Sequence, residues 1–209
     1  MKTIVDAPKD ARAAYVLAHG AGAGMRHAFM QAIAEGLAER GVAVLRYEFA
    51  YMEQGSKRPD APKVAQARVR EAVAEAGKRF PGLALFAGGK SFGGRMTSQA
   101  QAAEPLPGVH GLAFLGFPLH AAGKPSNERA AHLAGVKVPM LFLQGTRDAL
   151  ADLGLFRPVI AKLGKRATLE TFDQADHSFH VPARTGRSDD EVREELLEIL
   201  VRWFDSNTR

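Results

Sequence analysis

Residues 87–96 read AGGKSFGGRM, and two interpretations of this stretch predict different folds. Gly-Lys-Ser at 89–91 matches the end of a phosphate-binding loop, G-x-x-x-x-G-K-[ST], in which backbone amides and a lysine hold a nucleotide. The overlapping pentad 89–93 matches G-x-S-x-G, the sharp strand-to-helix turn that presents a serine nucleophile. The phosphate loop needs a glycine where the chain has Ala84, inside an apolar strand pattern. The sequence therefore favours the nucleophile turn.

A second glycine-rich stretch, GAGAG at 20–24, invites a dinucleotide-binding interpretation. The pattern G-x-G-x-x-G beginning at Gly20 requires a third glycine at the position of Met25, so the motif is incomplete. We therefore expect no nucleotide cofactor. The glycines are better explained as a loop in which the backbone can approach a substrate closely.

Apolar runs of strand length alternate with helical patterns along the whole chain. The continuous runs, which suit strands covered on both faces, are 14–19, 42–49, 83–88, 109–116, 138–145 and 167–172. The last helical pattern begins with a capping-box spacing, Ser188 to Glu191. The alternation predicts one α/β domain over residues 1–209, a three-layer sandwich with a mainly parallel central sheet. Ligands of such sheets bind beyond the carboxyl ends of the strands.

Composition narrows the class of protein further. The chain of 209 residues has no cysteine, which excludes disulfides, thiolate nucleophiles and cysteine-containing zinc sites. The N-terminal residues lack the apolar core of a secretory signal, and no run approaches the ~20 apolar residues of a membrane span. The net charge of +5 comes from scattered Lys and Arg with carboxylates between them. We expect a cytoplasmic protein that binds neither membrane nor nucleic acid.

A serine nucleophile needs a histidine base and a carboxylate that orients it, and the chain offers both in a suitable order. In the architecture of G-x-S-x-G hydrolases the order is serine, acid, histidine. Asp148 follows the apolar run 138–145, and His177 follows the run 167–172. Both should lie at the same edge of the sheet as Ser91.

Other residues compete for these positions. His180 lies three residues beyond His177, where the chain should be leaving the site. Asp173 and Asp176 belong to the histidine's own loop and are less able to face it from a neighbouring strand. His177 and Asp148 are therefore preferred. A metal pair of the two histidines lacks a third ligand, so no metal is expected.

The tetrahedral intermediate of acyl transfer needs backbone donors for its oxyanion. One is the amide of Phe92, the residue after the nucleophile. The second should come from the glycine-rich loop, where Ala21 is preferred and its neighbours Gly22 and Ala23 remain alternatives. His19, at the start of this loop, is expected to support it by hydrogen bonding rather than to act as a second base.

The segment 117–138 is too short for a large lid and can hold a loop and one helix. This predicts an open, shallow site that favours small or protruding acyl groups over long-chain lipids. A cationic rim made by Lys90, Arg95, His120 and Lys124 is one prediction. Exposed or paired positions on the helix surface are preferred for Lys90 and Arg95. The substrate-binding residues themselves are not predicted.

Six segments carry a family resemblance: LAHGAGAGMRHAFM (17–30), RYEFAYME (46–53), GGKSFGGRM (88–96), FPLHAAGKP (117–125), LQGTRD (143–148) and DHSF (176–179). With these segments the chain resembles the alpha/beta-hydrolase superfamily, and it looks closest to the small, dienelactone-hydrolase-like members. In particular it resembles a group of predicted hydrolases whose eukaryotic relatives include a testis-expressed protein and a subunit of the non-specific-lethal chromatin complex.

The resemblance implies the roles of nucleophile for Ser91, acid for Asp148 and base for His177, and it names no substrate. The ordered triad, with each member after a strand, predicts a serine hydrolase that cleaves a small-molecule ester or thioester of a small or exposed acyl group through an acyl-enzyme. Dienelactone hydrolases proper use a cysteine nucleophile, so their substrate is not carried over. The chromatin relative motivates an alternative, a non-catalytic binding or scaffold protein on the same fold. Nothing in the sequence marks the extended groove of a peptidase, and the oligomeric state is not predicted.

Overall fold

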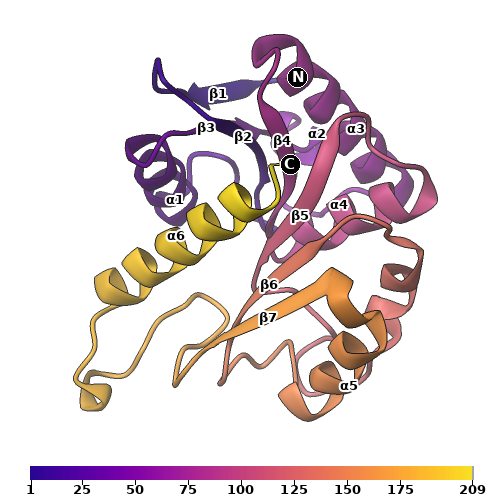
Figure 1. Ribbon diagram of the computed structural model, residues 1–209. Coiled ribbons are helices and arrows are strands. Elements are labelled where there is room, and N and C mark those ends of the chain that lie inside the picture. Colours follow the sequence, from indigo (N-terminus) through magenta and orange to yellow (C-terminus); the bar gives the residue numbers. More distant parts are fainter. Residues whose placement is uncertain (209) are drawn as a thin grey trace.

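A seven-stranded sheet runs through the middle of the molecule in the computed structural model, which describes residues 1–208 (Figure 1). The strands lie in the order β1-β3-β2-β4-β5-β6-β7, with β1 antiparallel to β3 and every other neighbouring pair parallel. Their bounds are β1 Thr3–Asp6, β2 Ala13–Ala18, β3 Val42–Tyr47, β4 Ala84–Lys90, β5 Val109–Leu115, β6 Met140–Gly145 and β7 Ala167–Phe172. The mainly parallel sheet expected from the alternating pattern is confirmed.

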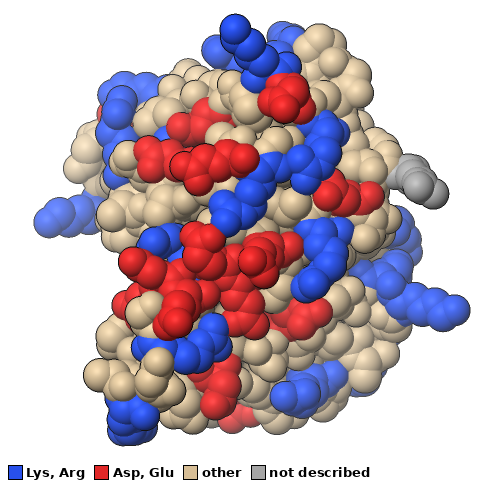
Figure 2. Space-filling view, turned by 60° about the vertical axis from the view of Figure 1, so that its left-hand side comes forward, with Lys and Arg blue, Asp and Glu red and all other residues tan. Residues whose placement is uncertain are grey.

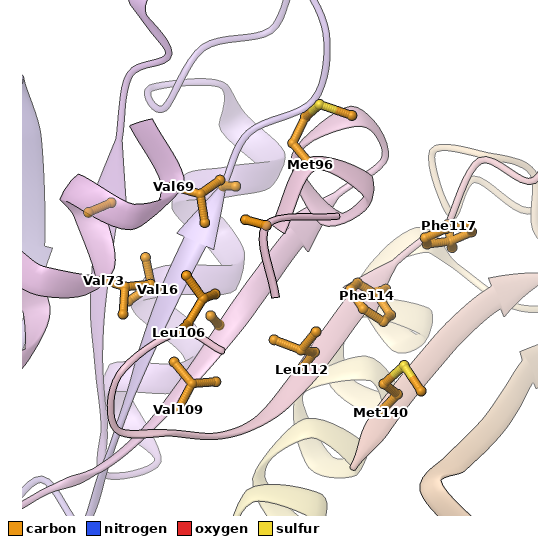
Figure 3. Packing of buried hydrophobic residues seen from close by; sticks show 14 of the residues in the cluster. Val16, Val69, Val73, Met96, Leu106, Val109, Leu112, Phe114, Phe117 and Met140 are labelled. Carbon is orange, nitrogen blue, oxygen red and sulfur yellow. The ribbon is translucent and has the colours of Figure 1, made fainter. Parts of the chain in front are cut away.

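Helices cover both faces of the sheet, as Figure 1 shows. Their bounds are α1 Ala28–Glu39, α2 Ala50–Glu53, α3 Pro62–Arg79, α4 Phe92–Ala103, α5 Leu153–Leu163 and α6 Asp189–Ser206. One buried cluster joins the sheet to α3, α4 and α5, and a second joins the opposite face to α1 and α6. Figure 3 shows the first cluster, in which Val69 and Val73 of α3 face Val16 of β2, with Met96 of α4 nearby.

The helix ends follow their sequence signals. Ser188 and Glu191 form the predicted capping box at the start of α6. An apolar stripe of α6 packs on the sheet, with Val192, Leu196 and Phe204 buried. On α3, Val64 is exposed, because the buried face of that helix is formed by Ala65, Val69, Ala72, Val73 and Ala76.

Three features differ from the sequence-based expectation. β1 was not expected, because its four residues TIVD are too few and too polar to show a strand pattern. The strand is held by an ion pair between its Asp6 and Arg46 of β3, with Oδ2 and Nη2 2.8 Å apart. The four-residue helix α2 was also not expected. β4 continues to Lys90, two residues beyond its predicted end, and therefore reaches the nucleophile turn without any intervening phosphate loop.

The segment between β5 and β6 contains a short 3₁₀ helix, Glu128–Gly135, and no lid domain. Among residues 1–208, no helix has both the length and the apolar character needed to cross a bilayer. On the face drawn in Figure 2, Lys and Arg side chains are interspersed with Asp and Glu rather than gathered into one basic patch.

Candidate active site

Ser91 occupies the turn between β4 and α4 in a backbone conformation that is rare for a residue with a side chain. Its φ and ψ are 50° and −115°, and its amide donates to the carbonyl of Leu115 at 3.1 Å. Non-glycine residues adopt such conformations only where the surrounding structure enforces them, and such positions cluster at functional sites. This is the geometry of a nucleophile elbow, in which a sharp turn presents the serine hydroxyl above the sheet.

The glycines around Ser91 make this turn sterically feasible. A Cβ on Gly93 would lie 2.5 Å from the carbonyl oxygen of His19 and 2.7 Å from the Cβ of Ala18. A Cβ on Gly89 would lie 2.1 Å from the carbonyl oxygen of Ala18. The end of β4 and the start of α4 therefore lie so close to β2 that a side chain at Gly89 or Gly93 would not fit.

Substitution of Gly93 by alanine is expected to lower the free energy of unfolding by about 1–3 kcal/mol, because the neighbouring atoms are two backbone oxygens and the Cβ of Ala18, and none of them can rotate away. The matched control is Gly77→Ala on α3, where a Cβ meets nothing within 4 Å. That variant should gain about 0.5–1 kcal/mol, since alanine is the better helix former. Urea unfolding of both variants tests this, and equal stabilities would contradict it.

The structure brings Ser91, His177 and Asp148 into one hydrogen-bonded chain. His177 Nε2 lies 2.9 Å from Ser91 Oγ, and His177 Nδ1 lies 2.7 Å from Asp148 Oδ2. The Asp148 side chain is fully buried, whereas a quarter of the His177 side chain is exposed. Asp148 is further fixed by Gln144 Nε2 at 2.5 Å and by the Leu150 amide at 2.7 Å. A buried acid with three donors is held in a single orientation toward the histidine.

The competing residues have other partners. His180 lies outside the site, with 63% of its side chain exposed and its Nδ1 2.8 Å from Asp189. Asp176 accepts hydrogen bonds from the amides of Ser178 and His180 and so shapes the histidine loop. Asp173 accepts a hydrogen bond from the Thr146 hydroxyl.

His19 supports the glycine-rich loop, as expected. It is fully buried; its Nδ1 donates to the carbonyl of Gly20 at 2.8 Å, and its Nε2 accepts from the amide of Phe49 at 3.1 Å. Burial lowers the pKa of His19, which keeps the imidazole neutral with its proton on Nδ1. Both ring nitrogens are thus occupied by backbone groups, and neither is free to act as a base.

The loop hydrogen bonds distinguish the candidate oxyanion donors. The amide of Gly22 donates to Tyr51 Oη at 3.0 Å, and that of Ala23 makes a long contact of 3.4 Å with the Gly20 carbonyl. Within residues 1–208, the amides of Ala21 and Phe92 have no hydrogen-bond acceptor. They are therefore available for an oxyanion, which favours Ala21 over its neighbours.

Tyr51 was missed by the sequence reasoning although it lies in the segment RYEFAYME. It is buried on α2, an element too short to show a helical pattern. Its hydroxyl reaches the glycine-rich loop, 29 residues earlier in the chain.

Tyr51→Phe is expected to lower kcat by up to about tenfold, which corresponds to the free energy of one neutral hydrogen bond. The phenyl ring preserves the packing, but the Gly22 amide loses its acceptor and the loop that carries Ala21 loses an anchor. Steady-state kinetics should show KM nearly unchanged. A kcat equal to that of the wild type would mean that Tyr51 does not order the loop.

A cavity of about 350 Å³ opens beside Ser91 and His177. Its walls are mostly apolar and include Phe29, Met30 and Leu150. A volume near the lower end of the usual range for ligand pockets suits a small ligand.

Of the four basic residues considered for a rim, Lys90 alone lines this cavity. The preferred prediction for Lys90, a place on the helix surface, is wrong: it is the last residue of β4, and its ammonium group donates to the carbonyl of His177. Arg95 lies on α4 and is partly buried, with no partner for its Nε among residues 1–208. His120 is buried and accepts from the amide of Asp152. Lys124 is exposed.

A mainly parallel sheet of this order, with a serine on the sharp turn after β4, defines the α/β-hydrolase class of fold. The chain belongs to the alpha/beta hydrolase domain family, whose model matches residues 11–205. The superfamily resemblance seen in the sequence is thereby confirmed. The narrower group with testis-expressed and chromatin relatives stays a prediction.

Solved structures share the fold at low sequence identity. A serine hydrolase without a lid from Xanthomonas campestris is 22% identical, with a TM-score of 0.73 over 96% of this chain and 88% of that one. A dienelactone hydrolase from Anabaena variabilis is 20% identical, with a TM-score of 0.77 over 99% and 92%. Est1E from Butyrivibrio proteoclasticus, with ferulic acid bound, is 18% identical, with a TM-score of 0.72 over 94% of each chain.

Proposed function

We propose that the protein is a serine hydrolase that cleaves a carboxylic ester or thioester of a small or exposed acyl group through an acyl-enzyme. The observation that carries the proposal is the continuous chain from Ser91 Oγ through His177 to Asp148, at 2.9 and 2.7 Å. Family membership supports it. The proposal includes a small-molecule substrate and a cytoplasmic location.

The reaction follows from this geometry. Ser91 Oγ attacks the acyl carbon while His177 Nε2 takes the hydroxyl proton, and Asp148 stabilises the imidazolium through Nδ1–H. The amides of Ala21 and Phe92 hold the oxyanion. The intermediate collapses when His177 gives its proton to the departing alcohol or thiol, leaving an acyl group on Ser91. Water then attacks this ester with His177 again as base, which releases the acid and restores the serine.

The size and lining of the cavity support the choice of substrate. Mostly apolar walls next to the serine suit an uncharged acyl chain or ring, and the volume of about 350 Å³ leaves little room for a long lipid. The similar structures include a dienelactone hydrolase and an esterase domain from Rhodothermus marinus. A scaffold protein would not require the three-residue chain of contacts, and no observation favours that alternative.

A panel of p-nitrophenyl esters, from acetate to palmitate, with matching acyl thioesters tests the proposal. We expect kcat/KM to be largest for short chains and to fall steeply for long ones, with Ser91→Ala as the control for background hydrolysis. A wild-type protein that hydrolyses no short ester or thioester, or that prefers palmitate, would count against the proposed substrate class.

A further inference from the structure

Lys90 precedes the nucleophile in the chain, and its side chain runs inward between three parts of the site. Its Cγ passes 3.5 Å from the position that a Cβ on Gly20 would take. Its Nζ donates a hydrogen bond to the main-chain carbonyl of His177. The same nitrogen lies 5.9 Å from the ring centre of Phe29 and 5.4 Å from that of Phe179. Lys90 therefore contacts the glycine-rich loop, α1 and the histidine loop together.

Placing the Lys90 ammonium group here costs desolvation free energy. No carboxylate among residues 1–208 lies within ion-pair distance of Lys90. Burial lowers the pKa of Lys90 to about 8, although Asp148 and Asp176 act in the opposite direction. An apolar side chain of similar length would fill the space without the desolvation cost. The fold alone therefore gives no reason for a lysine here.

The loop that carries His177 has a strained backbone on both sides of the histidine. Gln174 and Phe179, on either side of the histidine, have φ values of 57° and 64°, which are unfavourable for residues with side chains. Asp176 makes hydrogen bonds within the loop, and Thr146, Arg147 and Asp189 hold its two ends. The bond from Lys90 is different, because it joins this loop to the residue next to Ser91.

We propose that Lys90 is a positioning residue that ties the loop of His177 to the turn of Ser91 and so keeps the base within reach of the nucleophile. Its effect on catalysis rests on the proposed function. Gly116 provides the space for this contact: a Cβ there would lie 2.9 Å from Lys90 Nζ and 3.4 Å from the His177 ring.

The pH dependence distinguishes positioning from a simple charge effect. The charged and titratable groups facing the ammonium are Asp148, Asp176 and His177. A charged donor makes a stronger hydrogen bond than a neutral amine, so the benefit of Lys90 should shrink as the pH rises through about 8. A charge effect has the opposite sign, because a nearby ammonium opposes the imidazolium that forms during attack and its neutralisation would raise the rate.

The test compares Lys90→Met, Lys90→Gln and the exposed control Lys124→Met with the wild type. Met keeps the aliphatic stem without a donor, whereas Gln keeps a neutral donor. In Lys90→Met we expect faster amide hydrogen exchange in residues 173–182 and a kcat at least about tenfold lower than that of the wild type. Its KM should stay within about threefold of the wild-type value, and its melting temperature should be equal to or above that of the wild type. Lys90→Gln should give intermediate values of loop exchange and kcat, and Lys124→Met should match the wild type in both. The ratio of wild-type to Lys90→Met kcat should fall above pH 8.

The proposal is overturned if Lys90→Met leaves loop exchange or kcat unchanged, or if the kcat ratio grows with pH. Hydrogen exchange needs no substrate, so it separates this proposal from the proposed function. A wild type that hydrolyses no ester, together with a loosened loop in Lys90→Met, would refute the hydrolase activity and leave the positioning contact standing. An active wild type matched by Lys90→Met in both readouts would refute the positioning role alone.

Discussion

Substitution of His177 by alanine is expected to lower kcat for a short ester by roughly 10⁴- to 10⁶-fold. The imidazole is the group that contacts the Ser91 hydroxyl, at 2.9 Å, and an unassisted hydroxyl is a poor nucleophile at neutral pH. KM should change little, because the cavity walls remain. Stopped-flow or steady-state ester hydrolysis measures the effect.

His180→Ala is the matched control for this prediction. His180 is three residues away, exposed, and paired with Asp189 rather than with the site. Its loss should leave kcat within about twofold of the wild type, with at most a small loss of stability. If His180→Ala were the inactive variant and His177→Ala the active one, the assignment of the base would be wrong.

Substitution of Asp148 by asparagine is expected to lower kcat by about 10⁴-fold with little change in size or packing. The two oxygens of Asp148 accept from three donors: His177 Nδ1, Gln144 Nε2 and the Leu150 amide. An asparagine amide group must present its own N–H to at least one of them. If it faces the histidine, Nδ1 becomes an acceptor, the proton moves to Nε2, and the ring can no longer take the serine proton.

Asp173→Asn is the control, because Asp173 is exposed and bonds only the Thr146 hydroxyl among the side chains of residues 1–208. Its kcat should remain within about twofold of the wild type. An Asp148→Asn variant that retained more than a tenth of the activity would show that Asp148 does not fix the tautomer of His177.

The fold and the three central residues could be predicted because their signals are local. Continuous apolar runs mark strands buried on both faces, and parallel strands bring the residues that follow them to one edge of the sheet. Ser91, Asp148 and His177 each follow such a run, and the structure places them in contact.

The remaining features depend on tertiary contacts that no local pattern records. Arg46 anchors β1 through Asp6, and α2 has only four residues, so neither element has a periodic signal. The direction of the Lys90 side chain was predicted wrongly, because a lysine beside a nucleophile turn is most simply placed in solvent. Its acceptor, the carbonyl of His177, lies 87 residues away in the chain.

Covalent labelling by a fluorophosphonate probe tests the central claim most directly. The probe reacts with a serine that a histidine base activates, and peptide mass spectrometry locates the modified residue. We predict one modified site, Ser91, with labelling lost in Ser91→Ala and strongly slowed in His177→Ala. Labelling that persists in Ser91→Ala, or a folded wild type that takes up no probe, would contradict the account.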